Sequence, residues 1–327
     1  MFRIRLVVIC FLVLVYCPNL VLGVNPILEE EKVSCANAMK LAYSVSRENY
    51  YSFEQNSALK ARYIAAFNEG VSCKWNEMKL FSTTLQCYGV KGKEPLTSKG
   101  ILLDTYGILA FRENTVLVCP RGTEEEGTEI NYYNKEQEKI SAIDVKKYPN
   151  LNTFRQFFDG KDSYLQSAYV HKGVLDALHS SYDEVLEEID SYASRKGLSM
   201  DDMKFLLTGH GLGGSISAAF VPSLKMKFQN SALYVLTYGA PTIFNATAVA
   251  AVHKEMPSED MVNLVTRLKN KNKVYDQVVV FSQKAYGFIR AGMNVFIDVE
   301  SSVGRAVPVN SIEAYETTES LIDKTAD

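Results

Sequence analysis

The sequence has no marked excess of charge of either sign. Its 327 residues include 35 lysines and arginines against 38 aspartates and glutamates, so it lacks the strongly basic surface with which nucleic-acid-binding proteins neutralise phosphates. After the N-terminal region it also lacks any apolar run long enough to cross a bilayer. We therefore expect no nucleic acid partner and no transmembrane segment in the mature chain.

Cysteines are few, and none has the spacing of a metal site. There is no C-x-x-C and no nearby pair of histidines, so we expect neither a metal nor a cofactor. Outside the first residues, four cysteines remain: Cys35, Cys73, Cys87 and Cys119. In an oxidising compartment they allow three pairings. We expect Cys73 to pair with Cys87, which gives the shortest loop, and Cys35 to pair with Cys119.

The N-terminus has the composition of a secretory signal peptide. Two arginines precede an apolar run from Leu6 to Tyr16, and small residues lie before a plausible cleavage position after Gly23. The run is short and Pro18 interrupts it, which argues against a membrane anchor. We therefore expect residues 1–23 to be removed and the protein to be secreted to the extracellular side.

The mature chain is predicted to form a single domain. Residues 24–327 suit one large α/β domain, and they contain no internal repeat and no low-complexity linker. One N-x-S/T sequon is present, Asn245-Ala246-Thr247. In a secreted protein it predicts glycosylation of Asn245 on a surface loop.

The order of predicted elements is that of an α/β fold. Helices are expected in two pieces within residues 29–68 and at 173–196, 212–227 and 247–253, and strands at 108–111, 115–119, 203–208, 233–238 and 262–266. The downstream strands alternate with helices, which indicates a mainly parallel sheet with helices on both faces. In such sheets a site lies beyond the carboxyl ends of the strands.

A glycine-rich turn follows the strand predicted at 203–208. Residues 208–214 read TGHGLGG, and a helix is predicted directly after them. The spacing Gly209-x-Gly211-x-Gly213 is that of the G-x-S-x-G nucleophile elbow of hydrolases, with glycine in place of the serine. A phosphate loop is disfavoured because no Lys-Ser/Thr follows and because no G-x-G-x-x-G precedes an acidic residue.

Four segments, in order, resemble the signatures of the class 3 (fungal-type) lipases. VCPRGT at 118–123 resembles the FRGT-like turn of that family, VHKGV at 170–174 its VHKGF-like segment, LTGHGLGG at 207–214 its GHSLGG and LTYGAP at 236–241 its TFGxP. The resemblance covers residues 100–282 well and the C-terminal residues poorly. It implies an α/β-hydrolase domain with a Ser-Asp-His triad and a place in lipid metabolism.

The resemblance also implies roles for residues near the turn. Thr123 and the backbone N–H of Leu212 would match the oxyanion hole of the family. Gly209, His210 and Gly213 would shape the elbow. His171, like His210, would belong to the non-catalytic scaffold rather than act as a base.

The triad that the resemblance implies is degenerate. Gly211 stands at the nucleophile position, and Asn310 occupies the place of the histidine near Tyr315. The acid position falls on Asn270 or, with a shifted register, on Asp276. Glycine cannot attack a carbonyl, and an amide cannot take a proton near neutral pH.

Neighbouring serines do not obviously replace the missing nucleophile. Ser215 and Ser217 lie on the helix after Gly211 and are predicted to serve close packing of that helix on the sheet. The leading hypothesis is therefore a catalytically inactive lipase homologue that keeps a hydrolase fold able to bind a lipid, an acyl ligand or a protein partner. Two alternatives stay open: a residual or unconventional lipase or carboxylesterase, and a structural or interaction module with a closed pocket.

Residues 124–162 lie where an interfacial lipase carries its mobile cover. They are highly charged and show no continuous apolar periodicity, and their obvious apolar side chains are Tyr132, Tyr133 and Ile140. We therefore predict a solvated loop over the surface rather than a working lid.

Overall fold

The structure is a computed structural model that describes residues 25–87, 101–122, 137–159, 166–268 and 287–299. The predicted signal peptide lies outside the described residues. Four of the predicted site positions also lie outside them, namely Thr123, Asn270, Asp276 and Asn310.

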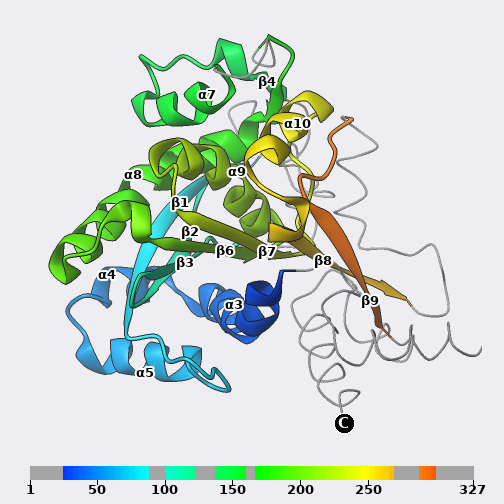
Figure 1. Cartoon of the computed structure of the whole chain (residues 1–327). Coiled ribbons are helices and arrows are strands. Elements are labelled where there is room, and N and C mark those ends of the chain that lie inside the picture. Colours follow the sequence, from blue (N-terminus) through cyan, green and yellow to red (C-terminus); the bar gives the residue numbers. More distant parts are fainter. Residues whose placement is uncertain (1–24, 88–100, 123–136, 160–165, 269–286, 300–327) are drawn as a thin grey trace, which may run out of the picture.

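A seven-stranded sheet crosses the described part of the chain, in the order β1-β2-β3-β6-β7-β8-β9 (Figure 1). Its strands are β1 Glu77–Cys87, β2 Ile101–Arg112, β3 Thr115–Cys119, β6 Lys204–His210, β7 Ala232–Tyr238, β8 Met261–Leu268 and β9 Met293–Val299. The β1–β2 and β2–β3 pairs are antiparallel, and every pair from β3 to β9 is parallel. The mainly parallel sheet predicted from the alternating elements is confirmed.

Helices cover both faces of this sheet (Figure 1). On one side lie α3 Pro26–Ser44, α4 Arg47–Ser52 and α5 Ser57–Phe67, and on the other lie α7 Asn152–Asp159, α8 Lys172–Lys196, α9 Leu212–Lys227 and α10 Ala246–Glu255. Each face has its own buried apolar cluster. Strand β6 contributes Phe205 and Leu207 to the cluster under α8 and α9, and Leu206 to the cluster under α3, because side chains alternate along a strand.

Short elements complete the described chain. They are the 3-10 helices η1 Ile140–Ala142, η2 Pro149–Leu151, η4 Met200–Asp202 and η5 Ser258–Asp260, and the strands β4 Gln137–Lys139 and β5 Tyr169–His171. Strands β4 and β5 form a separate antiparallel pair. None of the helices in the described ranges is long and apolar enough to cross a membrane.

Helix α8 protects the outer edge of β1. The Glu184 carboxylate accepts hydrogen bonds from the Ser82 backbone N–H at 2.8 Å and from the Tyr50 hydroxyl at 2.7 Å, while Ser180 Oγ accepts from the Thr84 N–H at 2.8 Å. Burial and the bond to Glu184 raise the pKa of Tyr50 to about 12. These bonds occupy strand N–H groups that would otherwise invite pairing with another chain.

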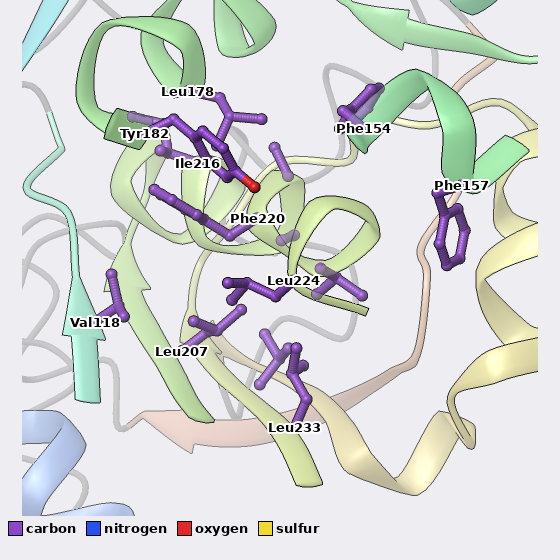
Figure 2. Packing of buried hydrophobic residues seen from close by; sticks show 14 of the residues in the cluster. Val118, Phe154, Phe157, Leu178, Tyr182, Leu207, Ile216, Phe220, Leu224 and Leu233 are labelled. Atoms are coloured by element: carbon purple, nitrogen blue, oxygen red, sulfur yellow. The ribbon is translucent and has the colours of Figure 1, made fainter. Parts of the chain in front are cut away.

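The prediction of a solvated surface loop is wrong for residues 137–159. Helix α7 packs against α9 and buries Phe154, Phe157 and Phe158, and Ile140 is also fully buried. Figure 2 shows Phe154 and Phe157 on this helix. The three phenylalanines follow the i, i+3, i+4 spacing of one helix face. Because the helix has only eight residues, the pattern does not repeat, and the charged residues around it suggested a solvent-exposed loop instead. Tyr132 and Tyr133 lie outside the described residues.

Neither predicted disulfide is formed. Cys73 is an exposed thiol, whereas β1 extends over 11 residues to Cys87. At about 3.3 Å per residue the strand spans roughly 33 Å, and the link from Cys73 to Glu77 recovers at most about 14 Å, so the remaining gap exceeds the ~7 Å reach of a disulfide. Cys35 and Cys119 are both buried in the apolar cluster under α3, but no disulfide joins them. Burial raises the pKa of the Cys119 thiol, which keeps it protonated.

Candidate functional site

The glycine-rich turn connects the end of β6 to the start of α9, as its sequence predicts. Gly211 is the N-cap of α9 and has φ 52° and ψ −126°. Its N–H donates to the Tyr238 carbonyl at 2.9 Å, and its own carbonyl accepts from the Ser215 N–H at 3.2 Å. A residue with a side chain pays about 1–3 kcal/mol in such a region of φ and ψ, whereas glycine adopts it readily. The turn therefore has a strained elbow geometry without a side chain at its centre.

Two flanking glycines allow backbones to approach closely at this turn. A Cβ on Gly209 would lie 2.6 Å from the Gly213 carbonyl carbon, and a Cβ on Gly213 would lie 2.2 Å from the Pro120 carbonyl oxygen. Both distances are shorter than real Cβ contacts, so no larger residue fits without movement of the backbone. The turn after β3 is thus pressed directly against the first turn of α9.

One of the two predicted oxyanion-hole donors, the Leu212 N–H, belongs to these touching turns. Leu212 is buried and begins α9, so its N–H has no acceptor within the helix. Thr123 lies outside the described residues, but Gly122 before it is described. A Cβ on Gly122 would lie 2.8 Å from the His210 carbonyl oxygen and 2.7 Å from the Tyr43 hydroxyl.

The His210 side chain contacts Tyr43 of α3. Its Nδ1 lies 3.0 Å from the Tyr43 hydroxyl, and the side chain is 8% exposed. The Arg121 guanidinium lies 5.6 Å from the centroid of the Tyr43 ring and donates to the Val45 carbonyl at 3.0 Å. Burial lowers the pKa of Arg121. These contacts are compatible with the structural, non-catalytic role that the resemblance implies for His210. No sequence pattern indicated that Tyr43 would contact it.

The serines nearest to Gly211 are fully buried. Ser215 Oγ donates to the Pro241 carbonyl at 3.0 Å, and Ser217 Oγ donates to the Thr208 carbonyl at 2.6 Å. Each hydroxyl therefore donates a hydrogen bond to a backbone carbonyl oxygen. Both serines serve the contact between α9 and the strands beneath it.

The other three histidines also have structural contacts. The His171 ring, at the end of β5, lies 6.1 Å from the Phe288 ring. His179 Nδ1 lies 2.5 Å from Asn150 Oδ1, and His253 Nε2 accepts from the Gly292 N–H at 2.9 Å. Within the described ranges, no group of three or more histidines, cysteines or carboxylates is arranged to hold a metal ion.

Asn263 fixes the segment beside the elbow, and sequence reasoning missed it. Its side chain is 1% exposed; Oδ1 accepts from the Ala240 N–H and from Thr237 Oγ1, each at 2.9 Å. The Arg290 guanidinium donates to the Ala240 carbonyl. Gly211 donates to the carbonyl of Tyr238, two residues before Ala240, so this network lies next to the elbow turn.

The predicted glycosylation site caps a helix. Asn245 Oδ1 accepts from the Ala248 N–H at 3.1 Å and from the Tyr169 N–H at 3.0 Å, and Nδ2 donates to the Ser167 carbonyl at 2.7 Å. The side chain thus joins α10 to β5, and its glycosylation stays a prediction.

Comparisons with known proteins agree with this geometry. Residues 126–274 match the sequence model of the family described as Lipase (class 3). The fold is similar to that of the nonglycosylated LIP2 lipase of Yarrowia lipolytica, with a TM-score of 0.53 and 16% identity over 83% of this chain and 79% of that one. The resemblance to class 3 lipases is confirmed, and the fold is that of the α/β-hydrolases.

Two curated relatives from Arabidopsis thaliana match a shorter segment. They are the chloroplastic phospholipases A1 PLIP2, 37% identical over 79 residues, and PLIP1, 36% identical over 78 residues. Each match covers 23% of this chain but only 11% and 12% of the respective relative. The chain is therefore lipase-like, and the shared segment is a small part of those enzymes.

Proposed function

We propose that this chain is a catalytically inactive, secreted class 3 lipase-like protein that binds an acyl lipid on its hydrolase scaffold. The observation that carries the proposal is Gly211 at the centre of an intact elbow turn. A glycine has no atom that can attack a carbonyl or hold an acyl group.

The surroundings of the turn offer no replacement nucleophile among the nearest serines. Ser215 and Ser217 are buried with their hydroxyls bonded to carbonyls. By the resemblance, Asn310 stands in place of the general base. A serine hydrolase that has lost triad members accelerates the reaction only about 10³–10⁴-fold over water. Substrate binding and the oxyanion hole supply this remaining acceleration.

The ligand class follows from the family and from what the turn retains. The proteins that the chain resembles are named lipases and phospholipases A1. Leu212 keeps a buried N–H at the start of α9, where the helix dipole favours a partly negative oxygen such as an ester carbonyl. A glycerolipid ester bound there would stay intact.

The test uses the purified full chain and two measurements of chemistry. Short- and long-chain p-nitrophenyl esters should show no turnover above buffer, and a fluorophosphonate probe should label no serine. A labelled serine whose replacement by alanine abolishes turnover would contradict inactivity and favour the alternative of an unconventional esterase.

Lipid binding is tested separately from chemistry. Titration with a fluorescent phosphatidylcholine should saturate, and thin-layer analysis afterwards should recover the lipid unhydrolysed. If the protein neither turns over esters nor binds this lipid, the closed structural or interaction module becomes the better account. Gly213→Ala is the matched variant, because its added Cβ meets the Pro120 carbonyl and should disturb the turn and reduce binding.

A further inference from the structure

The C-terminal end of α3 contacts both turns of the candidate site. Tyr43 lies in the last turn of α3, and Val45 is its C-cap. Tyr43 reaches the elbow through His210, and Arg121 reaches back to the Val45 carbonyl. Residues far apart in the sequence are therefore joined next to His210, the residue before Gly211.

The position of Arg121 is set by this helix end. Arg121 is 7% exposed, and its guanidinium lies over the Tyr43 ring and donates to a carbonyl at the C-terminus of α3. A helix C-terminus carries partial negative charge, and an aromatic face attracts a cation. Both interactions favour a buried cation here, so the turn that contains Arg121 is drawn toward α3.

Gly122 shows how closely the parts fit. The space beside its Cα is bounded by the Tyr43 hydroxyl and the His210 carbonyl, as the short Cβ distances above show. On the other side of the turn, Gly213 touches the Pro120 carbonyl. The Pro120–Gly122 turn is thus held between α3 and the first turn of α9.

We propose that Tyr43 is a positioning residue: its hydroxyl, through His210, holds the Pro120–Gly122 turn and the start of α9 in the arrangement that presents the Leu212 N–H. This inference rests on the proposed function in one respect only, namely that the Leu212 N–H donates to the carbonyl of a bound lipid. The positioning itself needs neither a ligand nor a reaction. It also makes the N-terminal helix a part of the site, although α3 lies outside the residues that match the family model.

The test is amide hydrogen exchange of the full chain, followed by mass spectrometry, for Tyr43→Phe. This variant removes the hydroxyl and keeps the ring beneath Arg121. Loss of one buried hydrogen bond should accelerate exchange about fivefold to tenfold in peptides that contain residues 120–122 and 211–213. Exchange in the middle of α8 should not change.

Tyr63→Phe is the matched control. Tyr63 is also buried among the N-terminal helices, and its hydroxyl donates to the Ser44 carbonyl at 3.1 Å, beside Tyr43. Its loss should affect α3 and α5 but not the two turns. Equal acceleration of the turns by both variants would mean that loosening of α3 in general is responsible, and unchanged turns in Tyr43→Phe would overturn the proposal outright.

A second pair of variants keeps the test decisive if Tyr43→Phe does not fold. His210→Asn places an amide atom near the position of Nδ1, whereas His210→Gln places it near Nε2. The first should largely retain slow exchange at the turns, and the second should lose it. The reverse order would refute a hydrogen bond to Nδ1 as the link. No outcome depends on lipid binding or on catalysis, so failure here leaves the proposed function standing.

Discussion

Replacement of Gly211 by serine is the most direct test of why glycine occupies the elbow. The residue has φ 52° and ψ −126°, a region that a side chain makes unfavourable. We expect Gly211→Ser to lower the free energy of unfolding by about 1–3 kcal/mol. For a domain of this size that is a fall in Tm of roughly 2–5 °C.

The assay is urea denaturation followed by circular dichroism, with Gly197→Ser as the matched control. Gly197 also has positive φ, 64° with ψ 30°, but it is the C-cap of α8 and a Cβ there would meet nothing within 4 Å. Its left-handed helical conformation is accessible to other residues at a cost of about 1 kcal/mol. Gly211→Ser should therefore be the more destabilising of the two.

The chemical readout accompanies the stability measurement. Gly211→Ser alone should gain little reaction with a fluorophosphonate, because no base is in place, and the pair Gly211→Ser with Asn310→His should gain more. If Gly211→Ser costs no more stability than Gly197→Ser, the idea of a strained elbow is wrong. In that case glycine at this position stabilises the protein no more than glycine at an ordinary left-handed helix end does.

Three further predictions concern the surroundings of the site. Gly213→Ala should cost about 1–3 kcal/mol of stability because its Cβ would overlap the Pro120 carbonyl, and an equally stable variant would show that the two turns are not in contact. Phe158→Ala should cost about 3–5 kcal/mol, since the side chain is fully buried on α7; an unaffected denaturation midpoint would restore the solvated-loop interpretation. For Tyr50, a folded-state pKa raised to about 12 means that the stability it contributes is present below the ordinary value near 10 and is lost as pH rises through 12. The difference in Tm between the protein and Tyr50→Phe should therefore shrink from pH 9 to pH 12, and a constant difference would refute the shift.

Local sequence patterns were enough for the core of the fold. The apolar runs of β3, β6 and β7 are short and buried, and the stripe of α8 stops at Gly197, which adopts the left-handed conformation expected of a helix end. Periodicity and helix-end signals of this kind depend only on near neighbours. The elbow was equally readable, because three alternate glycines between a buried strand and a helix are typical of a tight strand-to-helix turn.

Errors arose where distant residues decide the outcome. The predicted disulfides relied on sequence separation, but β1 carries Cys87 far from Cys73. The sequence analysis missed helix α7 because the partner that buries its three phenylalanines is α9, which lies far away in the sequence. The local sequence shows only a charged segment.

By itself, therefore, the sequence determined the order of the helices and strands from α8 to β8, the parallel sheet, the lipase-like turn and the absence of a nucleophile at Gly211, since each is a property of contiguous residues. Only the tertiary structure decided what surrounds that turn. Tyr43 on α3 meets His210 of the turn and Arg121 after β3, while Asn263 on β8 holds the neighbouring segment at Ala240. These hydrogen bonds and ring contacts join separate parts of the chain when the helices pack on the sheet, and no local pattern encodes such contacts.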